Sequence, residues 1–276
     1  MKALTLTFEV SRPTVSHMKV DVHASDGVGW LVLTRPEVRN ALDLDTIDEL
    51  TAGLDQHRTA GERAIVVAGA GNAFCAGADL ALVRTALAGV PAEVLGPLVD
   101  NLHEFIRRLR AFPAPVVAAV EGPAVGAGLG LALACDIRIA ARSAVFIPGY
   151  FGIGASPDAG VSAFLTRSIG TARAESIILR NASISAEQAA TWGMVEELVE
   201  DGGALHAAGA LAGKLAGTPP LALLRTRELV DSATTHSLDE HLDAERKAVA
   251  SMWPTDDFRE GVSAFLERRD PKFTGG

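Results

Sequence analysis

Cysteine and aromatic residues are scarce in this 276-residue sequence, which has two Cys, one Tyr, three Trp and 5% aromatic residues in all. Cys75 and Cys135 each lie inside a glycine-rich or apolar stretch and do not form the spaced set of a disulfide framework, which favours a reducing cytoplasm. Neither has a base beside it in the sequence, so neither is expected to be a nucleophile.

Basic residues, long apolar runs and metal-binding patterns are also lacking. The 25 basic and 34 acidic residues give a net charge of −9, which argues against non-specific binding of nucleic acid. No run of 18 apolar residues occurs, so no membrane span is expected. The seven histidines lack close pairing and the acidic residues lack calcium-loop spacing, so no metal is expected.

Glycine is concentrated in the stretch 115–136, PVVAAVEGPAVGAGLGLALACD, which predicts a buried strand, a tight turn and a helix. A glycine in a helix costs about 0.5–1 kcal/mol relative to alanine, so this density indicates that something approaches the backbone closely. Two explanations remain open. Either free N–H groups at the helix start bind a polarised oxygen of a ligand, or a neighbouring segment packs against the glycines and no ligand is bound.

A second glycine-rich turn has the same layout. The buried strand predicted at 63–68, RAIVVA, runs into GAGNAFCAGADL at 69–80, where small residues again leave backbone amides accessible before a helix. Two such turns can supply two N–H donors to one oxygen, which is the design of an oxyanion hole.

The two motifs together resemble the crotonase (enoyl-CoA hydratase/isomerase) superfamily, and the resemblance extends from about residue 18 to 273. It implies that the backbone N–H groups of Ala76 and Ala127 hold a thioester oxygen, with no chemistry by either side chain. Coenzyme A would be part of the substrate, and no separate cofactor is implied. Arg39 is expected to contact a CoA phosphate, although a surface arginine without a ligand is the alternative.

The resemblance also implies a set of substrate-binding positions and an assembly. Related proteins form trimers or dimers of trimers, in which the C-terminal region completes a neighbour's site. The implied substrate-binding residues are Arg39, Ala41, Gly77, Ala78, Asp79, Leu80, Gly126, Gly128, Tyr150, Phe151 and, reaching the neighbouring subunit, Phe265 and Arg268.

The alternation of strands and helices over 63–147 predicts an α/β fold with parallel strands, and the resemblance makes it a crotonase-like spiral of ββα units. A hairpin is predicted over 19–34, a helix over 41–58 with Asp43 as its N-cap, and almost only helices from Asp158 onward. We therefore divide the chain into residues 1–18, an N-terminal extension or tag remnant, 19–200, the spiral core, and 201–276, a C-terminal helical trimerisation region.

The sequence departs from the hydratases that it resembles, which use two glutamates flanking a water molecule. The corresponding positions are Gly130 and Tyr150. Glycine cannot transfer a proton, and an ordinary tyrosine, with a pKa of about 10, is a poor general base at neutral pH. Hydration by the two-carboxylate route is therefore disfavoured.

Asp158, in SPDAG, is the candidate base. It precedes a predicted helix, so an N-cap role is the alternative, and the two roles are compatible. The motif resembles the isomerases of the phenylacetate pathway, which implies that Asp158 shuttles a proton beside an enolate. His103 occupies the place of a catalytic histidine in related dehalogenases, but a histidine beside an apolar helix stripe is more commonly structural.

Three functions remain open from the sequence. The first is isomerisation of an unsaturated or epoxy acyl-CoA thioester by Asp158. The second is hydration or thioester hydrolysis by Asp158 and water. The third is a non-catalytic CoA-binding paralogue that keeps the fold.

Overall fold

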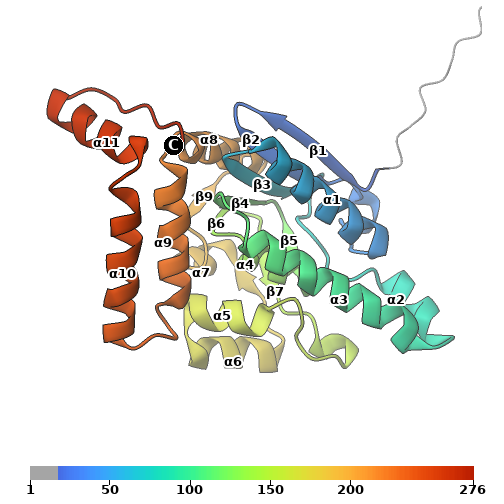
Figure 1. The fold of residues 1–276 in the computed structure, drawn as a ribbon. Coiled ribbons are helices and arrows are strands. Elements are labelled where there is room, and N and C mark those ends of the chain that lie inside the picture. The colour runs from blue at the N-terminus through green and yellow to red at the C-terminus, as the bar shows by residue number, and fades with distance from the viewer. Residues whose placement is uncertain (1–17) are drawn as a thin grey trace, which may run out of the picture.

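The computed structural model describes residues 18–276 (Figure 1). The prediction for residues 1–18 falls, apart from Met18, outside the described residues. The strands are β1 Val20–Ser25, β2 Val28–Leu33, β3 Ala64–Gly69, β4 Val116–Val120, β5 Pro123–Val125, β6 Ile137–Ala141, β7 Val145–Ile147, β8 Ile184–Ser185 and β9 Glu197–Val199. The helices are α1 Leu44–Ala60, α2 Leu80–Leu87, α3 Pro91–Arg110, α4 Ala127–Ala134, α5 Val161–Ile169, α6 Thr171–Arg180, α7 Ala186–Thr191, α8 Ala204–Ala216, α9 Pro220–Ser232, α10 Leu238–Met252 and α11 Asp256–Glu267, with 3₁₀ turns at Pro36–Val38 and Phe151–Ile153.

The main sheet has the strand order β1-β2-β3-β4-β6-β9. The predicted hairpin is confirmed, because β1 and β2 pair antiparallel across Asp26 and Gly27, both of which have positive φ. All other pairs in this sheet are parallel. Every residue of β4 is buried, as expected of a parallel strand covered on both faces. A smaller sheet, β5-β7-β8, lies beside it.

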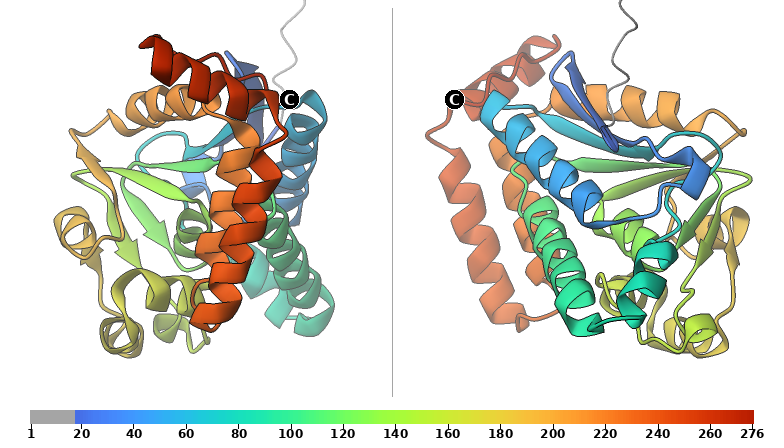
Figure 2. Two further views of the ribbon diagram at one scale, coloured as in Figure 1. Left: turned by 60° about the vertical axis from the view of Figure 1, so that its left-hand side comes forward. Right: turned by 90° about the vertical axis from the view of Figure 1, so that its right-hand side faces the viewer.

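Helices cover both faces of the main sheet (Figure 2). On one face α8 contacts β2, β3, β4 and β6 through a row of buried alanines four residues apart, from Ala204 to Ala216. Small side chains let this helix lie close to the strands. On the other face, α1, α3 and α4 contribute Leu50, Phe105 and Leu129 to the larger core.

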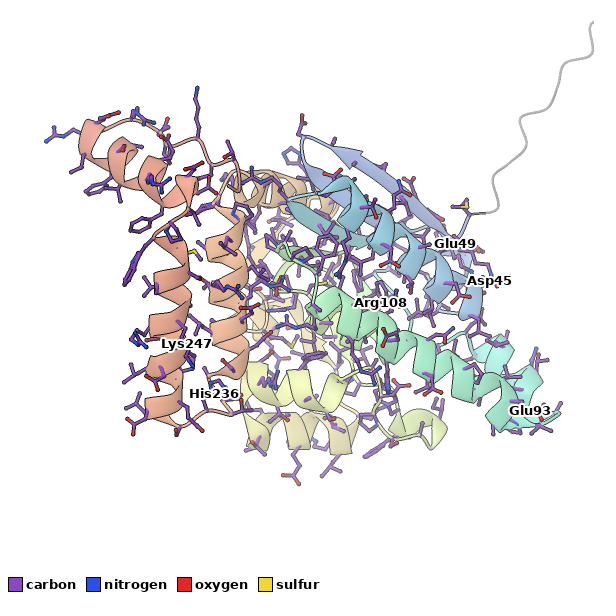
Figure 3. All side chains as sticks on the ribbon, in the orientation of Figure 1. Asp45, Glu49, Glu93, Arg108, His236 and Lys247 are labelled. Carbon is purple, nitrogen blue, oxygen red and sulfur yellow. The ribbon has the colours of Figure 1, made fainter. Side chains whose placement is uncertain are left out.

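Helix α1 is fixed at its start by charged groups. Asp43 is its N-cap, as predicted, and accepts a hydrogen bond from the backbone N–H of Thr46 at 2.9 Å. Lys19, just before β1, forms ion pairs with Asp43 and Asp45, and Glu49 accepts from the Lys19 N–H at 2.7 Å. Asp45 and Glu49 are labelled on α1 in Figure 3. These contacts fix the first strand against the helix.

The segment after Asp158 is mainly helical, and α9, α10 and α11 stand beside the body of the molecule (Figure 1). The prediction of a mainly helical segment is confirmed, but two short strands that it did not include interrupt the helices. The short strand β8 joins the small sheet, and β9 completes the main sheet beside β6. Helix α9 is tied to the body by Arg227, which donates to the carbonyl of Ala114 at 2.9 Å and pairs with Asp136.

None of the helices described in residues 18–276 combines the length and the apolar character that crossing a membrane requires.

Candidate active site

A cavity of about 260 Å³ lies where the two glycine-rich turns meet helices α2, α3 and α4. Its lining residues are Leu42, Ile47, Ala76, Gly77, Ala78, Leu80, Val83, Leu95, Leu98, Val99, Leu102, Val125, Gly126, Ala127, Gly149, Tyr150, Ile153, Ala155, Ser156 and Asp158. Most of this wall is aliphatic, and Tyr150 and Asp158 are its titratable side chains. The sequence had singled out both of these residues, but not Ser156, which also lines the cavity.

The fold brings the two turns into direct contact. The Val125 N–H donates to the Cys75 carbonyl at 2.9 Å, just before helix α4 begins at Ala127. Gly77 has a φ of 84°, and a Cβ added to it would lie 2.7 Å from the Val125 carbonyl oxygen and 3.3 Å from the Ala127 nitrogen. A residue without a side chain is required at Gly77 for this close approach.

Among the cavity-lining residues of the two turns, Ala78 and Ala127 have backbone N–H groups with no hydrogen-bond acceptor in the described part of the chain. Ala127 is the first residue of α4, so its N–H has no partner within the helix and feels the positive end of the helix dipole. Both residues line the cavity. They form a pair of donors suited to a polarised oxygen.

The prediction for Ala76 is corrected by this geometry. Its N–H donates to the carbonyl of Arg39 at 2.9 Å, so it is engaged in a backbone bond. Ala78, which the sequence placed only in the wider substrate-binding set, is the donor that is free. The signal was Gly77, whose positive φ redirects the chain just before Ala78.

Asp158 faces the cavity and is held by Tyr150. The Tyr150 hydroxyl donates to Asp158 Oδ1 at 2.7 Å and lies 3.3 Å from the Asp158 carbonyl oxygen. Burial, and then the charge of Asp158, raises the pKa of Tyr150, which keeps the phenol protonated as a donor. The N-cap interpretation of Asp158 was wrong, because Gly160 caps α5 and no side chain bonds there.

The backbone that carries Asp158 is itself fixed by neighbouring groups. Ala159 has a φ of 50° and its N–H donates to His103 Nε2 at 3.1 Å. His103 is therefore an acceptor for the loop backbone, as the structural interpretation of this residue predicts. A Cβ added to Gly130 would lie 2.5 Å from the Ala159 carbonyl oxygen, so the loop fills the space that a side chain at position 130 would need.

Several predicted binding residues lie outside the cavity wall. Asp79 accepts from the Ala81 N–H at 3.0 Å and forms an ion pair with Arg35, so it caps α2. A Cβ added to Gly128 would lie 2.3 Å from the Cys75 carbonyl oxygen, so Gly128 serves packing. The Phe151 side chain is 44% exposed and does not line the cavity.

Cys75 and Cys135 are both buried and free. Burial raises the pKa of each thiol to about 12, so neither is a thiolate at neutral pH. This agrees with the expectation that neither cysteine is a nucleophile.

The remaining predicted residues lie at two other places. Arg39 is exposed in a left-handed turn, and Ala41 is buried, with its carbonyl bound by Arg35. Phe265 and Arg268 belong to α11 and the residue that caps it, and do not line this cavity. Phe265 is 84% exposed and borders a separate apolar hollow of about 380 Å³ between α9, α10 and α11. Their proposed reach into a neighbouring subunit stays a prediction.

Comparison with known proteins shows which family this chain resembles. Residues 23–276 match the family described as enoyl-CoA hydratase/isomerase. The chain is 41% identical to the 1,2-epoxyphenylacetyl-CoA isomerase of Escherichia coli, over 92% of this chain and 97% of that one. It is 35% identical to the 2,3-dehydroadipyl-CoA hydratase of the same organism, over 89% and 94%.

A solved structure supports the same relationship. The enoyl-CoA hydratase from Polaromonas sp. JS666 superposes with a TM-score of 0.89 at 35% identity, covering 92% of this chain and 99% of that chain. This likeness confirms the predicted fold class.

Proposed function

This chain belongs to the enoyl-CoA hydratase/isomerase family of acyl-CoA enzymes, and from that premise we propose that it isomerises an unsaturated or epoxy acyl-CoA thioester. The backbone N–H groups of Ala78 and Ala127 bind the thioester oxygen and stabilise an enolate. Asp158 is the base that moves the proton. For a 3-enoyl thioester, the carboxylate takes a proton from the α-carbon and returns it to the γ-carbon, so that the double bond shifts with no net gain or loss of atoms.

The observation that carries this proposal is the meeting of one carboxylate with two free amides in an otherwise apolar cavity. Asp158 is the only acidic side chain among the described residues that line the cavity. A proton shuttle needs one such group, because the same carboxylate serves both carbons. The two amides supply the charge stabilisation that lets an α-proton leave, and losing one such donor typically costs about 10²–10³ in rate.

The geometry is unfavourable to the two-carboxylate hydration route. At Gly130, where hydratases that this chain resembles carry a glutamate, the Ala159 carbonyl oxygen already occupies the space next to the Cα. At the second position, Tyr150 is bound to Asp158 rather than available as a base. These contacts favour isomerisation over hydration by two carboxylates. Hydration by Asp158 alone remains the alternative, and the assay of several thioesters described below distinguishes it.

The cavity wall indicates the kind of acyl group. No lysine or arginine of the described residues lines it, and much of its wall is aliphatic, including Leu80, Val83, Leu95, Leu98, Val99 and Leu102. An acyl chain that ends in a carboxylate would have to bury an unpaired charge, which costs several kcal/mol. We therefore expect uncharged acyl groups to be favoured by about tenfold or more over dicarboxylic ones.

The test is a panel of purified thioesters, namely a 3-enoyl-CoA, its 2-enoyl isomer, a dehydroadipyl-CoA and epoxyphenylacetyl-CoA, assayed with the wild type and Asp158→Asn. Isomerase turnover should fall by about 10²–10⁴-fold in Asp158→Asn, because the amide keeps the shape but cannot take the proton. Binding of CoA thioester, measured by calorimetry, should change by less than about threefold. Asp100→Asn, which removes an exposed carboxylate from α3, is the matched control.

Three results would contradict the proposal. Turnover of Asp158→Asn within about threefold of the wild type would remove Asp158 from the chemistry. Hydration of the 2-enoyl thioester as the dominant activity would make the chain a hydratase. Tight thioester binding with no turnover of any panel member would make it a non-catalytic paralogue.

A further inference from the structure

Tyr150 is the only tyrosine in the chain, and its hydroxyl lies beside the proposed base. The ring is 6% exposed and forms part of the cavity wall. Among the described residues, the Tyr150 hydroxyl is the single donor to the Asp158 carboxylate, at 2.7 Å from Oδ1. Oδ2 is left without a protein partner there.

The contact does more than fill space. A carboxylate at the end of a short side chain rotates between staggered conformers unless a partner holds it. Asp158 does not cap α5, so the usual partner of an aspartate at this position is missing. The raised pKa of Tyr150, caused by burial and by the charge of Asp158, keeps the phenol protonated and therefore able to donate.

The backbone beneath Asp158 is held from a different element. His103 on α3 accepts from the N–H of Ala159 at 3.1 Å, which supports the positive φ of that residue. The His103 contact therefore fixes where the Asp158 backbone lies, and the Tyr150 contact acts on the side chain. Among the described residues that line the cavity, Tyr150 is the titratable group besides Asp158, and His103 on α3 contacts the backbone next to Asp158.

We infer that Tyr150 is a positioning residue for the proposed isomerisation: its hydroxyl holds Oδ1 of Asp158 so that Oδ2 is the oxygen that exchanges the proton with substrate. The inference rests on the proposed function for its kinetic consequence. It goes beyond that function by assigning a role to the side chain that stands where hydratases carry their second glutamate.

Tyr150→Phe is the first test, because it removes the hydroxyl and keeps the ring. Hydrogen bonds to charged groups are strong enough that kcat should fall by about tenfold or more, with KM within about twofold. The split between kcat and KM is the readout, because the retained ring still lines the cavity while the carboxylate loses the donor that holds it. Ser168→Ala, which removes a hydroxyl bound to the Phe164 carbonyl in α5, is the control and should leave kcat and KM in place.

A purely structural tyrosine would lower the melting temperature of the variant without lowering kcat at unchanged KM. An active wild type with a Tyr150→Phe variant of unchanged kcat would overturn the inference and leave the proposed function standing. An inactive wild type, or an equally active Asp158→Asn, would instead overturn the proposed function.

A second measurement does not depend on activity. Because the chain has one tyrosine, biosynthetic incorporation of 3-fluorotyrosine labels Tyr150 alone and gives a single ¹⁹F resonance. The chemical shift of this resonance should differ between the wild type and Asp158→Asn, because the hydroxyl donates to a carboxylate in one protein and faces an amide in the other. The same chemical shift in both proteins would show that the hydroxyl does not contact the carboxylate, and the inference would fall.

Discussion

Helices α4 and α10 both carry apolar residues, but those of α4 are buried and those of α10 are not. All eight residues of α4 are buried, and its glycines admit the carbonyl oxygens of other segments. No residue of α10 is buried, and Leu238 and Trp253 at its two ends are 73% and 58% exposed. Helix α4 is therefore covered by other segments of the same chain, whereas α10 presents apolar side chains that no part of residues 18–276 covers.

The difference lies in the kind of group that makes contact. Around α4 the contacts are between backbone atoms, so they require the absence of side chains and tolerate almost no added atom. Around α10 and α11 they are between side chains at a surface, with charged residues such as Lys247 among them (Figure 3). Substitutions should therefore act through geometry in the first region and through association in the second.

The largest expected effect is on turnover, from removal of one backbone donor. Ala127→Pro deletes the N–H at the first position of α4, where proline is best tolerated in a helix. We expect kcat to fall by about 10²-fold or more, which corresponds to about 2.7 kcal/mol of transition-state stabilisation. Steady-state kinetics on a folded variant provides the measurement.

Ala127→Gly keeps the N–H and is the matched control, which should stay active. Normal turnover by a correctly folded Ala127→Pro variant would mean that the glycine-rich turn is packing alone.

A smaller effect is expected on stability from matched glycine substitutions in the two regions. In Gly128→Ala the new Cβ would lie 2.3 Å from the Cys75 carbonyl oxygen, so the free energy of unfolding should fall by about 1–3 kcal/mol or more. In Gly261→Ala, on α11, the nearest atom is in the Phe273 ring at 3.5 Å, an ordinary contact. This variant should gain about 0.5–1 kcal/mol from helix propensity. Denaturant titration of both variants measures these free energies of unfolding. Equal changes in the two variants would contradict the expected difference between the two regions.

The smallest expected effect is on self-association. Phe265, 84% exposed beside the apolar hollow, is expected to be covered in an oligomer, predicted to be a trimer or a dimer of trimers. Phe265→Asp should weaken self-association by about tenfold or more, because burying a carboxylate replaces burying a ring. Light scattering after gel filtration across a dilution series measures it, with Phe265→Leu as the control. A wild type that stays monomeric at micromolar concentration would contradict the expectation that Phe265 is covered in an oligomer.

Much of the fold could be predicted from local pattern. The hairpin at Asp26–Gly27, the N-cap at Asp43, the buried strand β4 and the helix α3 all follow from residues within a short window. The strands β8 and β9 could not be predicted this way, because each is two or three residues long and forms only by pairing with distant strands. The polar groups of the site were likewise visible, since Asp158 and Tyr150 are the titratable residues of the cavity wall.

The sequence by itself determined that two glycine-rich turns precede two helices, that a single carboxylate follows them in SPDAG, and that neither hydratase glutamate is present. Only the tertiary structure decided which amide is free. The carbonyl of Arg39, from a distant turn, takes the N–H of Ala76 and leaves that of Ala78. The physical reason is that a buried N–H is paired only where the fold brings an acceptor within reach, so its partner depends on how the chain folds rather than on the residues beside it.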